Sequence, residues 1–186
     1  MKRILVSLLL LAGLIFQSAA FAQSEQIIEG TRMVGVATFE HIRNGEIIGT
    51  YGPFRNLVVN AGETALRDCF GGTGTPACTP VQNFKFHGIG TGTNAAAEGD
   101  TTLQTELTTQ YTSDNTRATG SQTNNGANIY RTIGTNTVDA TVAITEWGLL
   151  SQAATGGGTL WSRIVFSAIN LSSGDSLQTT YDLTIE

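Results

Sequence analysis

The C-terminal stretch "SLQTTYDLTIE", residues 176–186, decides the fold class. Its side chains alternate, with Leu177, Thr179, Tyr181, Leu183 and Ile185 on one face and Gln178, Thr180, Asp182, Thr184 and Glu186 on the other. A period of two is typical of a β-strand that buries one face. We therefore expect residues 176–186 to form a half-buried strand, which could also pair with a strand of a neighbouring chain.

Two further strands are expected before it. In "VDATVAITEWGLL", residues 138–150, the apolar positions alternate as far as Ile144 and then shift phase, which predicts a β-bulge near Glu146. "TLWSRIVFSAINL", residues 159–171, has the pattern of a long strand with apolar groups on both faces. Glycine-containing turns join these three strands, and consecutive strands joined in this way predict an antiparallel sheet.

The N-terminal half adds a hairpin and one helix. Asn44-Gly45 separates two β-prone runs, so we expect strands at residues 34–43 and 46–51 with a tight turn between them. A short strand at residues 57–59 and a helix at residues 62–69 follow. The predicted fold class is all-β, mostly an antiparallel β-sandwich or jelly roll, with one short helix.

The first 22 residues have the three parts of a secretory signal peptide. Lys2 and Arg3 precede a 13-residue apolar run, and Ala20-Phe21-Ala22 provides a cleavage site. That run is short for a bilayer-spanning helix, so a retained anchor is the weaker alternative. Cleavage before Gln23 leaves residues 23–186 as a single β-rich domain, exported and not held in a membrane. The charge of this mature chain would be −7, from 8 basic and 15 acidic residues with histidine neutral, which disfavours nucleic-acid binding.

Cys69 and Cys78 are the only cysteines, with eight residues between them. An even number of cysteines in an exported chain favours a disulfide, and the glycine- and threonine-rich loop can bend to close it. A metal pair is the weaker alternative, because neither a Cys-x-x-Cys motif nor a nearby histidine accompanies them. We expect no metal and no cofactor.

The segment "FKFHGIGTGTNAAAEGDTTL", residues 84–103, combines a histidine with a glycine-rich run. The run lacks the Gly-Lys-Ser/Thr ending and the long following helix of a phosphate loop, so we interpret its glycines as a strand end or a tight bend. His87 is expected to be a partly exposed strand residue, and His41 beside the hairpin to be solvated. Neither histidine has a recognisable catalytic partner, so we expect no catalytic residues and no enzyme.

Residues 94–128 are rich in Thr, Ser, Asn, Gln and Gly, and they could hold polar strands or form an exposed excursion. Asp100 is expected to cap one helical turn at "TLQTEL". A Ca²⁺ site at Glu98, Asp100 and Glu106 is disfavoured because their spacing matches no EF-hand. Glu146 is expected to turn outward or to bind backbone N–H groups within the predicted bulge.

Aromatic residues could form a surface that stacks on sugars. Trp147, Trp161 and Tyr111 are the candidate binding surface, and the competing interpretation places aromatic residues of alternating strands in the core.

Three segments resemble a module found in tail-fibre-like and other virion-associated proteins of tailed bacteriophages. They are "FKFHGIGTGTNAAAEGDTTLQTEL", "TEWGLLSQAATGGGTLWSRIVFSAINL" and "SGDSLQTTYDLTI", preceded by "NLVVNAG", and together they span residues 56–186. The resemblance implies a β-rich structural module with no catalytic residues to carry over. A signal peptide and an expected disulfide depart from that pattern. We therefore expect the chain either at a virion surface or exported by a bacterium, to the periplasm or to the extracellular space.

The function expected from these observations is that of a non-enzymatic structural protein. It would be a virion appendage or decoration, or an exported surface protein, that assembles with copies of itself or with other structural proteins. The alternative is a secreted carbohydrate- or surface-binding module, similar to an adhesin, that recognises a cell-surface glycan through its aromatic faces or through the polar residues 94–128. A hydrolase built on His87 with Asp100 or Glu98 ranks last.

Overall fold

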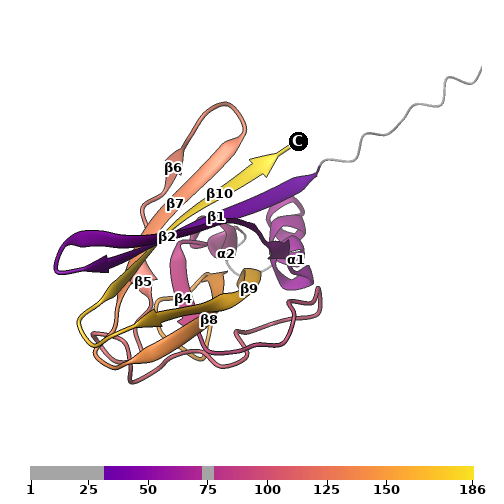
Figure 1. The fold of residues 1–186 in the computed structure, drawn as a ribbon. Coiled ribbons are helices and arrows are strands. Elements are labelled where there is room, and N and C mark those ends of the chain that lie inside the picture. The colour runs from indigo at the N-terminus through magenta and orange to yellow at the C-terminus, as the bar shows by residue number, and fades with distance from the viewer. Residues whose placement is uncertain (1–31, 73–77) are drawn as a thin grey trace, which may run out of the picture. The chain divides into compact units, whose positions relative to one another are not determined.

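The computed structural model describes residues 32–72 and 78–186, whose strands form two antiparallel sheets of five strands each (Figure 1). The two sheets pack against each other, so the predicted all-β sandwich is confirmed. The described residues form one compact unit. The expected signal peptide, residues 1–22, lies outside the described residues.

The spatial order of the strands in each sheet differs from their order along the chain. From edge to edge, the first sheet comprises β2 (Glu46–Arg55), β1 (Met33–Arg43), β10 (Ser176–Ile185), β7 (Ile129–Thr137) and β6 (Thr123–Asn124). The second comprises β3 (Leu57–Val58), β9 (Leu160–Leu171), β8 (Val142–Leu150), β4 (Phe86–Gly90) and β5 (Ala118–Thr119). The helices are α1 (Asn60–Phe70) and α2 (Thr79–Gln82).

Strand β10 has the predicted alternation, and its buried side chains are Leu177, Thr179, Tyr181 and Leu183. It pairs with β1 on one side and with β7 on the other. The expectation that this last strand could pair with a neighbouring chain is therefore wrong, because both of its edges are occupied. The long free edge of the first sheet is β2, and the predicted hairpin joins β2 to β1 through Asn44 and Gly45, both with positive φ.

The register of β8 against β9 shifts at the position predicted for the bulge. Ile144 pairs with Ile169 whereas Glu146 pairs with Val165, so the additional residues lie on β9. The apolar residues of β8 change phase at the same point, because Ile144 and Trp147 both belong to the core whereas Thr145 and Glu146 both bind Gly92. Glu146 and Trp147 lie on opposite faces of β8, and both are fully buried.

Aromatic side chains from both sheets fill the space between them. Phe39 of β1 lies 4.7 Å from Phe166 of β9 and 6.3 Å from Trp147 of β8, measured between ring centroids. Trp147 in turn lies 5.3 Å from Tyr181 of β10. These separations are those of favourable edge-to-face and tilted aromatic contacts, and they join the two sheets into one core.

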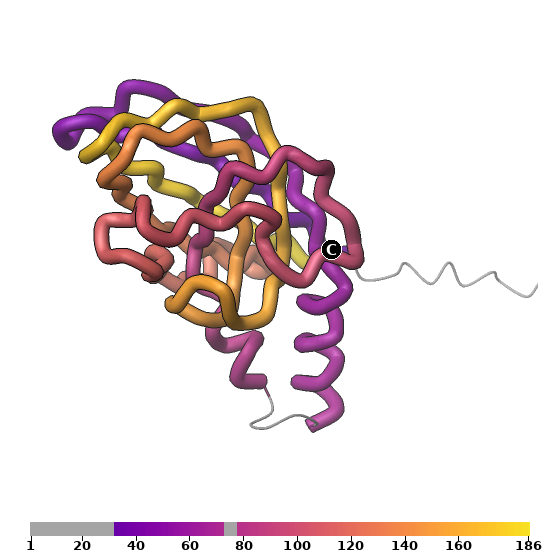
Figure 2. The backbone as a smooth tube through the Cα atoms, turned by 90° about the horizontal axis from the view of Figure 1, so that it is seen from below, coloured from indigo at the N-terminus to yellow at the C-terminus, as the bar shows by residue number. Residues whose placement is uncertain are grey.

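Helices α1 and α2 lie next to each other at one end of the sandwich (Figure 2). The first was predicted, although it begins two residues earlier than expected, and the second was not, because a four-residue helix has no periodicity to reveal it. The expected disulfide between Cys69 of α1 and Cys78, which precedes α2, is present. No helix among residues 32–72 and 78–186 has both the length and the apolar character needed to cross a bilayer.

The polar stretch between β4 and β5 covers the second sheet. This covering segment, residues 91–117, runs across β8 and β9 in Figure 2, and it buries Leu103, Leu107, Tyr111 and Arg117. Its neighbours in the sheet are glycines: a Cβ at Gly88 or Gly148 would lie 2.9 Å from a Leu103 methyl group. Most of the other side chains of residues 94–117 are exposed, so this polar stretch packs on the sheet through a few buried side chains, and the short strands β5 and β6 follow it.

Candidate functional site

A buried carboxylate, that of Glu146, fastens the covering segment to the second sheet. Its Oε1 accepts hydrogen bonds from the backbone N–H groups of Gly92 at 3.1 Å and Thr105 at 2.7 Å, and its Oε2 accepts one from Gln104 at 3.0 Å. A Cβ at Gly92 would lie only 2.6 Å from Oε1, so glycine is required for this approach. One of the two expectations for Glu146 was that it binds backbone N–H groups of the bulge. It does bind backbone N–H groups, but they belong to the covering segment.

Arg163 neutralises this carboxylate. Its Nε donates to Glu146 Oε2 at 2.8 Å, its Nη1 donates to Asp100 Oδ2 at 2.9 Å, and its Nη2 donates to the Asn94 carbonyl at 3.1 Å. The Arg163 side chain is fully buried. A buried guanidinium with this many acceptors is compensated for the loss of water, so the cluster holds residues 92–105 in place.

Asp100 does not cap a helix, and "TLQTEL" is not helical. Its carboxylate accepts a hydrogen bond from the Ala97 N–H at 3.0 Å and pairs with Arg163. The expected helical turn is wrong because the extended segment gains more from hydrogen bonds to Glu146 than a single isolated turn could provide.

A second buried ion pair lies further along the covering segment. Arg117 Nε and Nη2 donate to the carboxylate of Glu106, and Nη1 donates to the carbonyl oxygens of Gln152 at 2.7 Å and Gly157 at 2.9 Å. The carboxylate of Glu106 is thus committed to a guanidinium. Within the part of the chain that the structure describes, no cluster of three or more His, Cys, Asp or Glu residues is arranged to hold a metal ion.

His87 lies inside the sandwich and not at a partly exposed position as expected. Its Nε2 is 3.0 Å from Thr132 Oγ1, and its ring centroid is 5.5 Å from that of Trp147. Burial disfavours the charged imidazolium and lowers the pKa of His87 to about 3. Asp100 binds Arg163 on the opposite face of the second sheet, so the structure does not bring together the residues of the hydrolase hypothesis.

His41 is also buried, and the expectation that it is solvated is wrong. Its Nε2 lies 2.7 Å from Asp175 Oδ2, in the turn between β9 and β10. Arg43 donates to both oxygens of the same carboxylate, at 2.8 and 2.7 Å, and the Ser172 N–H donates at 2.8 Å. The hydrogen bonds from Arg43 are the largest cause that holds the pKa of Asp175 well below its usual range. This cluster ties the β1–β2 hairpin to the neighbouring turn.

The predicted aromatic binding surface is wrong. The exposed fractions of Trp147, Trp161 and Tyr111 are 0%, 3% and 1%. Trp147 belongs to the core between the sheets, and the hydroxyl of Tyr111 donates to the Ile89 carbonyl at 3.1 Å under the covering segment. The alternation along the strands indicated one buried and one exposed face for each sheet. It did not reveal that the second sheet is covered on both faces, by the first sheet and by the covering segment.

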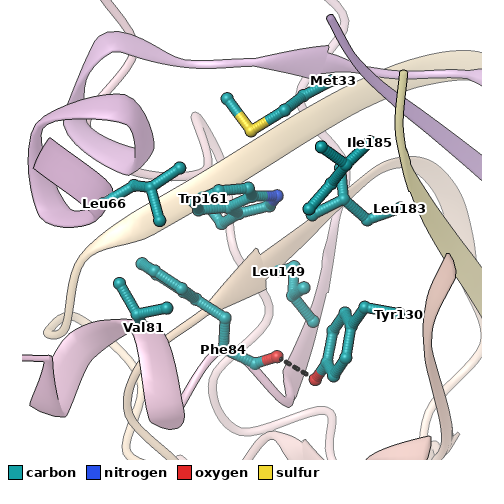
Figure 3. Close-up of a pocket in the computed structure, with 9 residues that line it drawn as sticks. All are labelled: Met33, Leu66, Val81, Phe84, Tyr130, Leu149, Trp161, Leu183 and Ile185. Carbon is teal, nitrogen blue, oxygen red and sulfur yellow. Dashed lines mark hydrogen bonds between the residues drawn. The ribbon is translucent and has the colours of Figure 1, made fainter. Parts of the chain in front are cut away.

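The structure contains an apolar pocket that the sequence did not reveal (Figure 3). Its volume is about 230 Å³. The side chains that line it come from both helices and both sheets: Met33, Leu66, Val81, Phe84, Tyr130, Leu149, Trp161, Leu183 and Ile185. Of the predicted site residues, only Trp161 contributes to it. The one signal in the sequence was the pair of apolar residues, Val81 and Phe84, that follows the second cysteine.

The Tyr130 hydroxyl at the pocket wall donates a hydrogen bond of 2.7 Å to the Phe84 carbonyl (Figure 3). It also accepts one from Gln122 Nε2 at 3.1 Å. The Trp161 N–H donates to the Tyr181 hydroxyl at 3.2 Å. Both polar groups at the wall are therefore occupied, and the remaining lining is hydrocarbon and sulfur.

Comparisons of the chain with protein-family models, with curated protein sequences and with solved structures gave no match.

Proposed function

We propose that the chain is a non-enzymatic structural module that assembles with copies of itself or with other structural proteins, at a virion surface or outside a bacterial cell. Two kinds of observation support this. Residues 56–186 resemble virion-associated modules of tailed bacteriophages. In addition, the buried charged groups Glu146, Arg163, Arg117 and Asp175 are each bound to loops or turns, so their chemistry serves to fix the shape of the molecule.

The observation that carries the proposal is the tip of the β1–β2 hairpin, which extends from the edge of the sandwich (Figure 1). Ile47 and Ile48 are adjacent at this tip, with exposed fractions of 56% and 49%. The hairpin is held in place through His41 and Arg43, which bind Asp175. Exposed apolar side chains on a rigid support are typical of a contact surface between proteins.

Association through these side chains is favoured over the addition of a strand to β2. The register of β2 against β1 shifts twice, between Ala37 and Phe39 and between His41 and Ile42, and β2 also contains Pro53. Irregular pairing and a proline, which lacks a backbone N–H, are features that prevent edge strands from accepting further strands.

The test is the oligomeric state of the exported protein, measured by sedimentation and electron microscopy over a range of concentrations. We expect discrete oligomers, and we expect Ile47→Ser/Ile48→Ser to yield monomers. Ile133→Ser is the matched control, because Ile133 of β7 is exposed on the first sheet and away from the hairpin tip. A monomeric wild-type protein at every concentration, or an assembly that the double substitution leaves intact, would overturn the proposal.

Export is part of the same proposal. The Cys69–Cys78 disulfide supports an oxidising destination. Sequencing the N-terminus of the protein recovered from the periplasm or medium should give Gln23 as the first residue. Recovery of uncleaved protein from the cytoplasm would contradict this part.

The alternative, a carbohydrate- or surface-binding module, loses one of its two supports, because the three aromatic residues proposed for sugar stacking are buried, whereas most of the polar residues 94–117 are exposed.

A further inference from the structure

Among the described residues that line it, the apolar pocket has no polar group that a ligand could use. The two polar groups at its wall, the Tyr130 hydroxyl and the Trp161 N–H, are hydrogen-bonded within the protein. A ligand that placed a hydroxyl or a charged group in the pocket would lose its hydrogen bonds to water and find none in exchange. The lining therefore selects against sugars and other polar molecules, and in favour of hydrocarbon.

The volume of the pocket, about 230 Å³, is large enough for a ligand. An apolar cavity of about 150 Å³ is sufficient for a molecule of benzene. The pocket therefore has room for an aromatic ring or a short alkyl chain. It is also open to solvent, because Ile185 at its wall has an exposed fraction of 47%, so a polar group attached to the ligand can remain in water.

The walls of the pocket are fixed in advance. Leu66 of α1 and Val81 of α2 form one side, and the Cys69–Cys78 disulfide links the two helices. On the other side Met33 of β1 and Ile185 of β10 are paired in the register of the first sheet. A preformed pocket avoids much of the entropy that is lost when a site must order around its ligand.

We propose that this pocket binds the hydrocarbon portion of a small amphiphile, with the polar group of that ligand at the opening. The proposal adds a binding function to the structural one and does not depend on self-assembly.

A series of linear alcohols from butanol to octanol tests it, with binding to the exported protein followed by calorimetry and by the NMR signals of the Leu66, Val81 and Leu149 methyl groups. We expect Kd to fall by about fourfold for each added methylene, the factor that corresponds to burying one CH₂ group, until the chain outgrows the pocket. Glucose, the polar control, should not bind.

Val81→Phe places a ring in the pocket and should weaken octanol binding by at least about tenfold. Leu66→Phe does the same from α1 and serves if the first variant fails to fold. Gln82→Phe is the matched control, because Gln82 is the exposed neighbour of Val81 on α2, and it should bind as the wild type does.

Absence of saturable binding, a Kd independent of chain length, or equal binding by wild type and both pocket variants would overturn the proposal. So would release of monomers from an oligomer in step with octanol binding, because side chains of a second copy would then be the natural occupants. Loss of assembly in the Ile47→Ser/Ile48→Ser protein with octanol binding unchanged would separate this proposal from the structural one.

Discussion

The covering segment and the apolar pocket differ in the kind of side chains that they bury and in how completely these fill the space. Under the covering segment, a carboxylate, a guanidinium and several backbone groups are buried together, and each is matched by a partner at 2.7–3.1 Å. At the pocket the side chains are almost all apolar, and they leave about 230 Å³ unfilled. In the first region the buried polar groups have hydrogen-bond partners, whereas the second region has space for a larger side chain. The cluster under the covering segment therefore fixes the shape of the molecule, whereas the apolar pocket has room for a ligand.

The largest loss in the free energy of unfolding is expected for a substitution of Glu146, the buried carboxylate under the covering segment. Glu146→Gln changes a single atom of the side chain but leaves Arg163 without its closest buried counter-charge. Breaking a buried ion pair costs about 3–5 kcal/mol, so we expect a loss of this size in the free energy of unfolding, measured with urea by tryptophan fluorescence.

Glu98→Gln is the control for that substitution, because Glu98 is an exposed carboxylate of the same covering segment. It should change stability by less than about 0.5 kcal/mol. A loss under about 1 kcal/mol for Glu146→Gln would show that the cluster does not hold the segment in place.

Acid should destabilise the core through His87. The folded protein keeps His87 neutral down to a pKa of about 3, whereas the unfolded chain takes up the proton near pH 6.5. Stability is therefore complete above pH 6.5 and falls as the pH is lowered from 6.5 towards 3, by up to about 1.4 kcal/mol per pH unit.

Thermal unfolding followed from pH 7 to pH 4.5 measures this slope. His87→Phe keeps a ring but removes the titration, so its slope should be clearly flatter. Asp175, whose pKa is lowered, loses its contribution only below its ordinary pKa of 3.8, which lies outside the interval measured. Equal slopes for the two proteins would contradict the prediction.

The disulfide should matter more to the pocket than to the covering segment. Replacing Cys69 and Cys78 together by serine removes a short cross-link, which is expected to cost about 2–3 kcal/mol of stability. It also frees α1 from α2, so octanol should bind more weakly. Exchange of the Gln104 and Thr105 amide protons, which are bound to Glu146, should change only by the amount of the global destabilisation. Faster exchange at these two amides than elsewhere would show that the regions are coupled.

Filling the pocket should have the smallest effect on stability. Val81→Phe adds most of a ring, yet the pocket has space for it, so we expect a change within about 1 kcal/mol in urea unfolding. A loss as large as that of Glu146→Gln would remove the contrast between the two regions.

The sequence predicted local features of the fold well. The alternation in residues 176–186, the Asn44-Gly45 turn, the disulfide and the position of the bulge each depend on residues close together in the chain, and the structure confirms all four. The bulge shows where such reasoning ends, because the phase shift appears on β8 whereas the additional residues are on β9. A pattern in one strand cannot show which partner strand is irregular.

The candidate site could not be predicted, because its contacts join distant residues. Glu146 binds Thr105, 41 positions earlier, and His87 binds Thr132, 45 positions later. The sequence left open whether Trp147, Trp161 and Tyr111 form an exposed surface or belong to the core, because a sandwich usually leaves one face of each sheet in water. The covering segment removes that face from the second sheet. The apolar residues on both faces of residues 159–171 were the available sign of this cover.

The irregular β2 edge affects whether neighbouring copies of this molecule can pair edge to edge when they lie close together. A regular free edge of ten residues would recruit one chain after another, and growth by edge pairing has no natural end. An edge with two shifts of register and a proline prevents that growth, which leaves the exposed isoleucine pair at the hairpin tip as the contact that we propose. Under the proposed function, copies displayed at high density would therefore be kept from joining edge to edge into a fibre.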